Sequence, residues 1–299
     1  MKVLIATDGS DSAETAMRAA VRILDPEDRH LDLLCVMPVW NKNDETGRRK
    51  RCEERTCRET AKILDDAKAA IRGDAVDVRR LSESGSPAAV VADKTGDYDL
   101  TVIGALGIGF RSDAGLGPVA SRVVAHALGP VLVGRAMRSE EGLRILAAVD
   151  GSAASFHAVE TVGELCDLNS AEVCLMYVAE TPWVQLALEG DWASSSEEEI
   201  DSSEAGVFEK ELVDEGEALI EDARKLLRHA RLVVNSRIEE GNPANEILAE
   251  AERGQYDLVV LGSTGNRDLK HQMLGSVSSR IAWEAPCSVL IVTEPGETG

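Results

Sequence analysis

Aromatic residues are scarce in this chain: Trp, Tyr and Phe together make up 3% of its 299 residues. Hydrophobic residues nevertheless reach 44%, which is ordinary for a globular protein. The core must therefore be built from Ala, Val, Leu and Ile. The length suits two domains of common size, each large enough to bury a core of its own.

Long apolar runs are missing as well. No stretch approaches the ~18 to 20 residues that a membrane-spanning helix requires. Met1-Lys2 leads directly into a short apolar segment, with no signal-peptide pattern. The sequence therefore predicts a soluble, cytoplasmic protein without a membrane segment.

Basic residues are outnumbered, with 32 Lys and Arg against 53 Asp and Glu and a net charge of −21. Nucleic-acid binding draws its affinity from clustered Lys and Arg, so this balance argues against a nucleic-acid partner. The basic run at Arg48–Arg51 is interpreted as a solvated loop or the start of a helix. The acid-rich surface bears on solubility and not on activity.

Paired cysteines are also absent, because none of the six cysteines belongs to a CxxC pair. Cys35, Cys174 and Cys287 lie in apolar runs and are expected in the core. Cys52 and Cys57 stand five positions apart in a charged segment without a His cluster. We therefore predict neither a metal site nor a disulfide.

What the chain does contain is an alternation of apolar runs and helical patterns. In the first half, the predicted strands cover residues 2–7, 31–36, 76–81, 100–103 and 131–133. Asp11 and Glu14 resemble a capping box at the start of an amphipathic helix, and a polar helix is expected over residues 53–71. This alternation predicts an α/β fold with mostly parallel five-stranded sheets and right-handed crossovers.

The series then restarts, so the chain is an internal repeat. Asp150-Gly151-Ser152 repeats Asp8-Gly9-Ser10 after 142 residues. We predict a first domain at residues 1–137 and a second at 143–295, with the linker at 135–141. The spacing between the copies later grows by 14 residues, which indicates an insertion in the second copy. We expect it around residues 191–204 as a solvated loop.

A glycine pattern follows the fourth predicted strand of each half. In the second half, Gly262 and Gly265 are followed after nine residues by Gly275-Ser276; Gly104, Gly107 and Gly117 lie 158 positions earlier. Glycines allow positive φ angles and a close approach to a ligand. The helix that begins there offers unpaired N–H groups to an anion. The pattern therefore predicts phosphate binding at the carboxyl edge of each sheet, where Asp8 and Asp150 also lie.

These residues resemble the universal stress protein family, whose nucleotide-binding branch carries G-x2-G-x9-G-(S/T) after the fourth strand and an Asp after the first. The resemblance spans nearly the whole chain, except the insertion and linker. It implies two repeated Rossmann-like or flavodoxin-like domains, of the adenine nucleotide alpha hydrolase type. It also implies a binding site for ATP, or for AMP or ADP, in the second domain, with Mg as a candidate companion ion.

The resemblance assigns roles in the second domain. Asp150 would contact the ribose or lie beside the adenine, although a helix cap is the alternative role for this residue. The main chain of Val178 would meet the adenine edge, and the glycines would allow close approach. The phosphates would be held by backbone N–H and hydroxyl groups at four positions, Gly275, Ser276, Val277 and Ser278.

The first half departs from the pattern at Pro118, which has neither the N–H nor the hydroxyl of Ser276. We therefore expect weaker nucleotide binding there, none, or a different ligand. The residues that retain the pattern are Asp8, Val36, Gly104, Gly107 and Gly117.

Three functions stay open at this point. The expected one is a regulatory stress-response module that binds an adenine nucleotide with little or no hydrolysis; neither a Walker-type nor a pyrophosphatase loop is present. The alternatives are a nucleotide-independent interaction scaffold and a slow ATPase. His271, in the nine-residue loop, is expected as a solvated loop residue, and contact with terminal phosphates is its alternative role. The resemblance also implies that the two fifth strands pair within the chain, and a homodimer is possible.

Overall fold

The computed structural model describes residues 1–26, 29–37, 48–71, 77–108, 115–139, 142–180, 202–227, 232–265 and 274–293, and the side chains of residues 48–54 and 202–211 are not among those described. Strands and helices alternate in the first half. Its strands are β1 (Lys2–Ala6), β2 (His30–Met37), β3 (Asp77–Ser84), β4 (Leu100–Gly104) and β5 (Val131–Gly134). Its helices are α1 (Asp11–Ile23), α2 (Arg48–Ala70), α3 (Pro87–Lys94) and α4 (Pro118–His126), with a short 3-10 turn at Thr95–Asp97.

The second half repeats this order. Its strands are β6 (Leu143–Ala148), β7 (Ala171–Ala179), β8 (Val233–Glu240), β9 (Leu258–Gly262) and β10 (Ser288–Val292). Its helices are α5 (Ala153–Leu165), α7 (Ser202–Leu226), α8 (Pro243–Arg253) and α9 (Ser276–Glu284). The predicted α/β fold of two repeated domains is confirmed.

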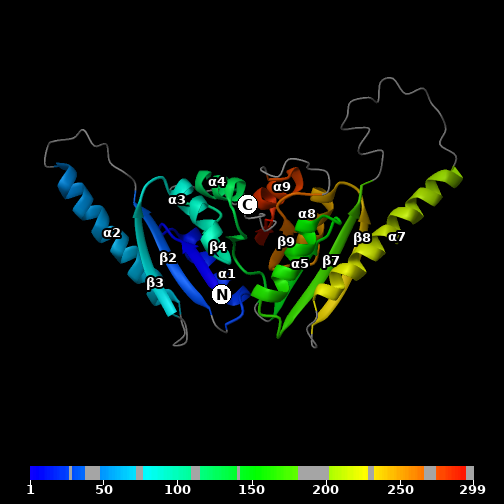
Figure 1. Ribbon diagram of the computed structural model, residues 1–299, viewed down its shortest axis with the longest axis horizontal. Coiled ribbons are helices and arrows are strands. Elements are labelled where there is room, and N and C mark those ends of the chain that lie inside the picture. The colour runs from blue at the N-terminus through cyan, green and yellow to red at the C-terminus, as the bar shows by residue number, and fades with distance from the viewer. Residues whose placement is uncertain are drawn as a thin grey trace, which may run out of the picture.

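All ten strands form one sheet in the order β3-β2-β1-β4-β5-β10-β9-β6-β7-β8. Neighbouring strands are parallel within each half, whereas β5 and β10 are antiparallel, with Leu132 opposite Leu290. The expected pairing of the two fifth strands is thus present within one chain. It removes two apolar sheet edges from solvent. In Figure 1, α2 and α7 consequently lie at opposite outer ends of the molecule.

Helices cover both faces of this sheet, because alternate strand residues point to opposite sides. One hydrophobic cluster joins Val3 and Ile5 to α1, α2, α5 and α7. The other joins Leu4 to α3, α4, α8 and α9. Each cluster contains residues of both halves, so the two repeats share their core.

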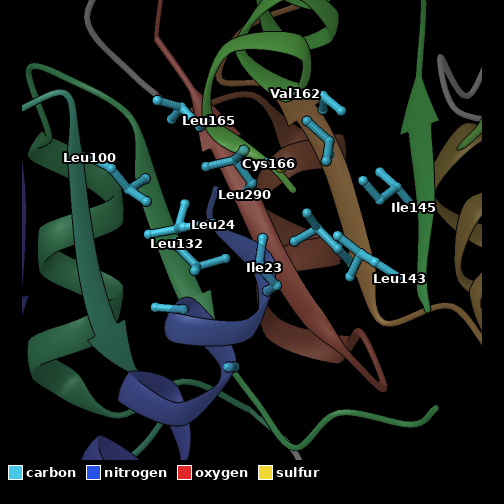
Figure 2. Close-up of a cluster of buried hydrophobic side chains, with 14 of the residues drawn as sticks. Ile23, Leu24, Leu100, Leu132, Leu143, Ile145, Val162, Leu165, Cys166 and Leu290 are labelled. Atoms are coloured by element: carbon cyan, nitrogen blue, oxygen red, sulfur yellow. The ribbon is translucent and has the colours of Figure 1, made fainter. Parts of the chain in front are cut away.

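The ends of α1 and α5 meet at the junction between the halves. Leu24 and Cys166 form an antiparallel β-bridge, and around it Asp25 N donates to Leu165 O (2.9 Å) while Asp167 N donates to Ile23 O (2.8 Å). Figure 2 shows the side chains of Ile23, Leu24, Leu165 and Cys166 beside residues of β5, β6 and β10. Each partner lies 142 positions after its counterpart, so the contact is nearly symmetric.

The predicted linker is held against the second half. Arg135 exchanges hydrogen bonds with the Ser288 hydroxyl through its own main chain (3.0 and 3.2 Å). Its guanidinium donates to the carbonyl oxygens of Ala282 (2.6 Å) and Cys287 (3.3 Å). Burial lowers the pKa of this guanidinium. These contacts fix the direction in which the chain leaves β5.

Asp257 completes this attachment. Its fully buried carboxylate accepts hydrogen bonds from the N–H groups of Arg138 (2.8 Å), Ser139 (2.9 Å) and Arg144 (3.1 Å) and from the Ser139 hydroxyl (2.6 Å). One carboxylate therefore ties the linker and β6 to the start of β9.

Some boundaries differ from the sequence predictions. The predicted capping box is wrong by one residue: Ser10 is the N-cap of α1, its Oγ accepting from Ala13 N (3.2 Å), and Asp11 is already helical. The basic run at Arg48–Arg51 is the first turn of α2. Because α7 begins at Ser202, the predicted loop at 191–204 ends earlier, and residues 191–201 lie outside the described residues.

The cysteine predictions can be compared with the five thiols in the described part of the chain. Cys35, Cys166, Cys174 and Cys287 are buried, Cys57 is exposed, and all five are free. Helices of the described segments are too short or too polar to cross a membrane.

Candidate functional site

A pocket of about 450 Å³ opens at the carboxyl ends of β6, β7 and β9. Parallel strands place their carboxyl ends at one edge, where α/β proteins bind ligands. The pocket contains all eight second-domain residues that the sequence singles out, which are Asp150, Val178, Gly262, Gly265, Gly275, Ser276, Val277 and Ser278.

Asp150 follows β6 and organises the turn before α5. Its Oδ1 accepts from Ser152 N (3.0 Å) and from Ser152 Oγ (2.6 Å). Ser152, and not Asp150, is the N-cap of α5, because its Oγ accepts from Ser155 N (3.1 Å). The helix-cap alternative for Asp150 is therefore wrong, and the carboxylate faces the pocket.

The first turn of α9 forms the opposite wall. Gly275 is the N-cap, with φ −62° and ψ 157°, and its N–H donates to Ser263 O (2.8 Å). The N–H groups of Ser276, Val277 and Ser278 follow, and such first-turn groups have no partner inside their helix. The buried Ser278 hydroxyl donates to Gly262 O (2.7 Å), so its proton is engaged within the protein. Ser276 also lines the pocket, and its side chain carries a second hydroxyl.

One part of the glycine prediction is wrong, because no positive φ occurs at the six motif glycines. Among the described glycines, the positive φ angles include Gly9 (79°) and Gly151 (81°) in the Asp-Gly-Ser turns. A Cβ at Gly262 would lie 2.8 Å from Ala154 Cβ, and one at Gly265 would lie 2.8 Å from Asp150 Oδ2. Glycine is needed at these two positions because α5 and the Asp150 carboxylate pack directly against the loop.

Sequence reasoning missed part of the wall. Glu180 follows β7, Glu215 and Leu212 lie on α7, and Pro243 and Ile247 lie on α8. Pro243 was detectable, since the Gly-Asn-Pro turn repeats the one at Gly85. Glu215 was not, because the insertion before α7 breaks the alignment of the two copies. With Asp150, the two glutamates place three carboxylates in the lining of the pocket, whereas the first turn of α9 carries the positive end of a helix dipole.

The first domain has a smaller pocket of about 240 Å³ at the equivalent edge. It contains the five residues predicted there, Asp8, Val36, Gly104, Gly107 and Gly117. Pro118 is the first residue of α4, as expected from the tolerance of proline at that position. Both predicted sites are therefore assembled as pockets.

Metal ligands do not gather in the described segments: they contain no group of three or more His, Cys, Asp or Glu side chains able to hold a metal ion. His271 lies outside the described residues.

Comparison with known proteins agrees with the repeat. The model of the universal stress protein family matches residues 1–135 and again residues 143–293. A universal stress protein of Mycolicibacterium smegmatis is 26% identical, over 97% of this chain and 96% of its own. One from Methanocaldococcus jannaschii is 33% identical, over 53% of this chain and 88% of its own.

A solved structure resembles the chain over its full length. It is a universal stress protein from Archaeoglobus fulgidus, with a TM-score of 0.59 and 18% identity, and the match covers 98% of this chain and 96% of that one. At this identity the likeness shows the fold alone. Together with the two family matches, it leads to one conclusion: the chain belongs to the universal stress protein family and carries two copies of its domain.

Proposed function

We propose that the second domain binds an adenine nucleotide and that the protein acts as a nucleotide-dependent regulatory module in stress response. The observation that supports this is the wall of the 450 Å³ pocket, where the first turn of α9 presents its N–H groups and the Ser276 hydroxyl. A helix N-terminus of this kind attracts phosphate through its free N–H groups and its dipole. ATP, ADP and AMP all fit this requirement.

The charge distribution suggests one orientation of the ligand. Phosphates would lie at Gly275–Ser278, where donors are available. The amino group of adenine and the ribose hydroxyls are donors, so they suit the carboxylates of Asp150, Glu180 and Glu215 in the pocket lining. The reverse orientation would bring phosphates against three carboxylates and is disfavoured by charge repulsion.

Hydrolysis is proposed to be slow or absent. The pocket residues that could accept a proton are the carboxylates of Asp150, Glu180 and Glu215, which this orientation assigns to the adenine and ribose and not to the phosphates. General-base catalysis requires the base within hydrogen-bond reach, or one water, of the attacking group. Incubation of the purified protein with ATP and chromatography of the products tests this: we expect no ADP or AMP above the protein-free control.

The substitution Ser276→Pro tests nucleotide binding. It removes one N–H and one hydroxyl from α9, and the fold should accept it, because Pro118 stands at the same first position of α4. A tenfold excess of AMP over its Kd stabilises a binding protein by about 1.4 kcal/mol, so the wild-type melting temperature should rise. The variant should lose that rise.

Ser276→Ala is the matched control, since it removes the hydroxyl but keeps the N–H. It should retain part of the shift. Unchanged melting of the wild-type protein with ATP, ADP and AMP would contradict the proposal and would favour the nucleotide-independent scaffold.

A further inference from the structure

The two pockets differ in chemistry at corresponding positions of their glycine loops. At five positions the first half has an apolar residue, whereas the residue 158 positions later in the second half is polar. The first half has Ala105, Leu106, Ile108, Pro118 and Ala120 where the second has Ser263, Thr264, Asn266, Ser276 and Ser278. Every hydroxyl or amide side chain at these positions has been replaced together, so the change reaches well beyond Pro118.

The main-chain donors of the first loop are also engaged. Leu106 N–H donates to the Ser12 hydroxyl (3.0 Å), and Ile108 N–H donates to Asp8 Oδ2 (3.0 Å). Gly117 N–H donates to Ala105 O (2.8 Å), just as Gly275 N–H donates to Ser263 O in the second half, so the difference at the helix start is Pro118, which has no N–H. The second half has Ala154 in place of Ser12, so that hydroxyl partner is specific to the first half. A phosphate at this loop would meet apolar side chains and few available donors.

The inner end of the first pocket is nevertheless open. Asp8 and Thr7 line it together with apolar residues of the sheet and α3, including Leu34, Val36 and Val91. The Asp8 carboxylate accepts one hydrogen bond at each oxygen, from Ser10 N and Ile108 N. Because each carboxylate oxygen has two lone pairs, it can accept a further donor from a ligand, whereas it repels an anion.

The size of the pocket limits the ligand as well. Its volume is about 240 Å³, against about 450 Å³ in the second domain and roughly 300–1,000 Å³ for sites of drug-sized ligands. It suits a ring with a small polar substituent better than a ring with a phosphate chain. Burial of a phosphate against Leu106 and Pro118 would remove water from a charge without replacing its hydrogen bonds, which is strongly unfavourable.

We propose that the first-domain pocket binds an uncharged nucleoside and rejects its phosphorylated forms. The ring lies against the apolar wall, and a hydroxyl or amino group donates to Asp8. The protein would then bind two different molecules, a phosphorylated nucleotide in the second domain and a phosphate-free nucleoside in the first.

Adenosine and AMP test this directly, because they differ by one phosphate. The second site is first closed by Gly265→Val, whose Cβ would lie 2.8 Å from Asp150 Oδ2. Equilibrium dialysis of this full-length variant should show one adenosine bound per chain and AMP bound at least tenfold more weakly. No adenosine binding, or AMP binding as tightly as adenosine, would overturn the proposal.

Gly107→Val is the matched change in the first domain, where an added Cβ would lie 3.0 Å from Asp8 Oδ2. Combined with Gly265→Val, it should abolish the remaining adenosine binding. Val119→Trp is a second way to obstruct the pocket at a position that is 41% exposed, so the fold should tolerate it. Adenosine binding that survives both changes in folded protein, as judged by circular dichroism, would place the ligand elsewhere and overturn the assignment.

A gain of function completes the test. Leu106→Thr, Pro118→Ser and Ala120→Ser together restore three of the five polar side chains of the second half. In the Gly265→Val protein they should strengthen AMP binding at least tenfold, and an unchanged preference for adenosine would contradict the role of these positions. The chain with Gly107→Val alone measures AMP at the second site separately, so failure of either site is recognised independently of the other.

Discussion

The two halves share one framework and differ at its ligand-binding edge. The Asp-Gly-Ser turns, glycine positions and strand order are repeated, and even the contact between α1 and α5 is nearly symmetric. At five corresponding positions after β4 and β9, the side chains are instead apolar in the first copy and polar in the second. Duplication has kept the residues that packing requires and allowed the ligand-facing residues to change.

A second difference concerns how each half is fastened. Asp99 and Asp257 occupy equivalent positions, but Asp99 is exposed and its carboxylate accepts from Lys2 N (2.6 Å), whereas Asp257 is buried with four donors. Asp257→Ala should therefore lower the free energy of unfolding by about 3–5 kcal/mol, because each buried donor left without an acceptor costs about 1–3 kcal/mol. Asp99→Ala should cost about 1 kcal/mol or less.

Urea denaturation of both variants measures this pair. Equal losses of unfolding free energy would show that the hydrogen bonds from the linker to Asp257 contribute nothing. Only the contact shared by both halves, from Lys2 N to Asp99 and from Arg144 N to Asp257, would then matter. A small loss for Asp257→Ala alone would mean that water replaces the carboxylate in the linker.

The seam between the halves should respond symmetrically. Leu132 and Leu290 face each other across β5 and β10 and are both nearly fully buried. Leu132→Ala and Leu290→Ala should each lower the free energy of unfolding by about 2–5 kcal/mol, the range for a buried leucine. Both should leave a single unfolding transition, because the hydrophobic clusters run through both halves.

Differential scanning calorimetry distinguishes the outcomes. Two resolved transitions in the wild-type protein, or a loss confined to one transition in either variant, would show that the halves unfold independently. That result would contradict the shared core.

Acid should weaken both halves through different carboxylates. In the first half, the hydrogen bond from Arg79 lowers the pKa of Asp32, although burial acts to raise it. In the second half, burial acts to raise the pKa of Asp257, but hydrogen bonds from Ser139, Arg144 and Arg138 outweigh it and the pKa is lowered. A carboxylate with a lowered folded-state pKa stabilises the protein above its unfolded pKa, and this contribution is lost as the pH falls toward the folded value.

The stability of the wild-type protein should therefore fall as the pH drops below the unfolded pKa of about 3.9. Asp32→Asn and Asp257→Asn should each lower stability at neutral pH and flatten this fall, and the double variant should flatten it further. Parallel stability curves for wild type and both variants would show that other groups control acid unfolding. Denaturation in urea at a series of pH values supplies the measurement.

The repeated α/β fold was predictable from the sequence, whereas the contacts that individual residues make were not. Apolar runs located the five strands of the first half, and the repeat spacing indicated that the series restarts in the second, although no predicted strand covered β8. The resemblance to the family identified the eight residues around the second pocket. The need for glycine at position 262 became clear only from the approach of Ala154, which is distant in sequence. Likewise, the bond from Leu106 N–H to Ser12 joins residues that no local pattern connects.

The smallest predicted effect concerns a pair of equivalent tyrosines held by different acids. Tyr98 donates to Asp32 of β2 (2.7 Å), whereas Tyr256 donates to Glu250 of α8 (3.2 Å). Counted from the helix starts, Lys94 of α3 corresponds to Glu250, so the acid has moved from the strand in one half to the helix in the other.

Replacement of either tyrosine by Phe removes one hydrogen bond but keeps the ring, so each variant should lose about 0.5–1.5 kcal/mol. Tyr256→Phe should lose more, because Tyr256 is 6% exposed and Glu250 only 1% exposed, so water has poor access to the acceptor left behind. The double variant should show the sum of the two losses, since the pairs lie in different halves and share no partner. Urea denaturation measures these losses. A loss in the double variant well above the sum would show that the two tyrosine–carboxylate hydrogen bonds are energetically coupled across the halves.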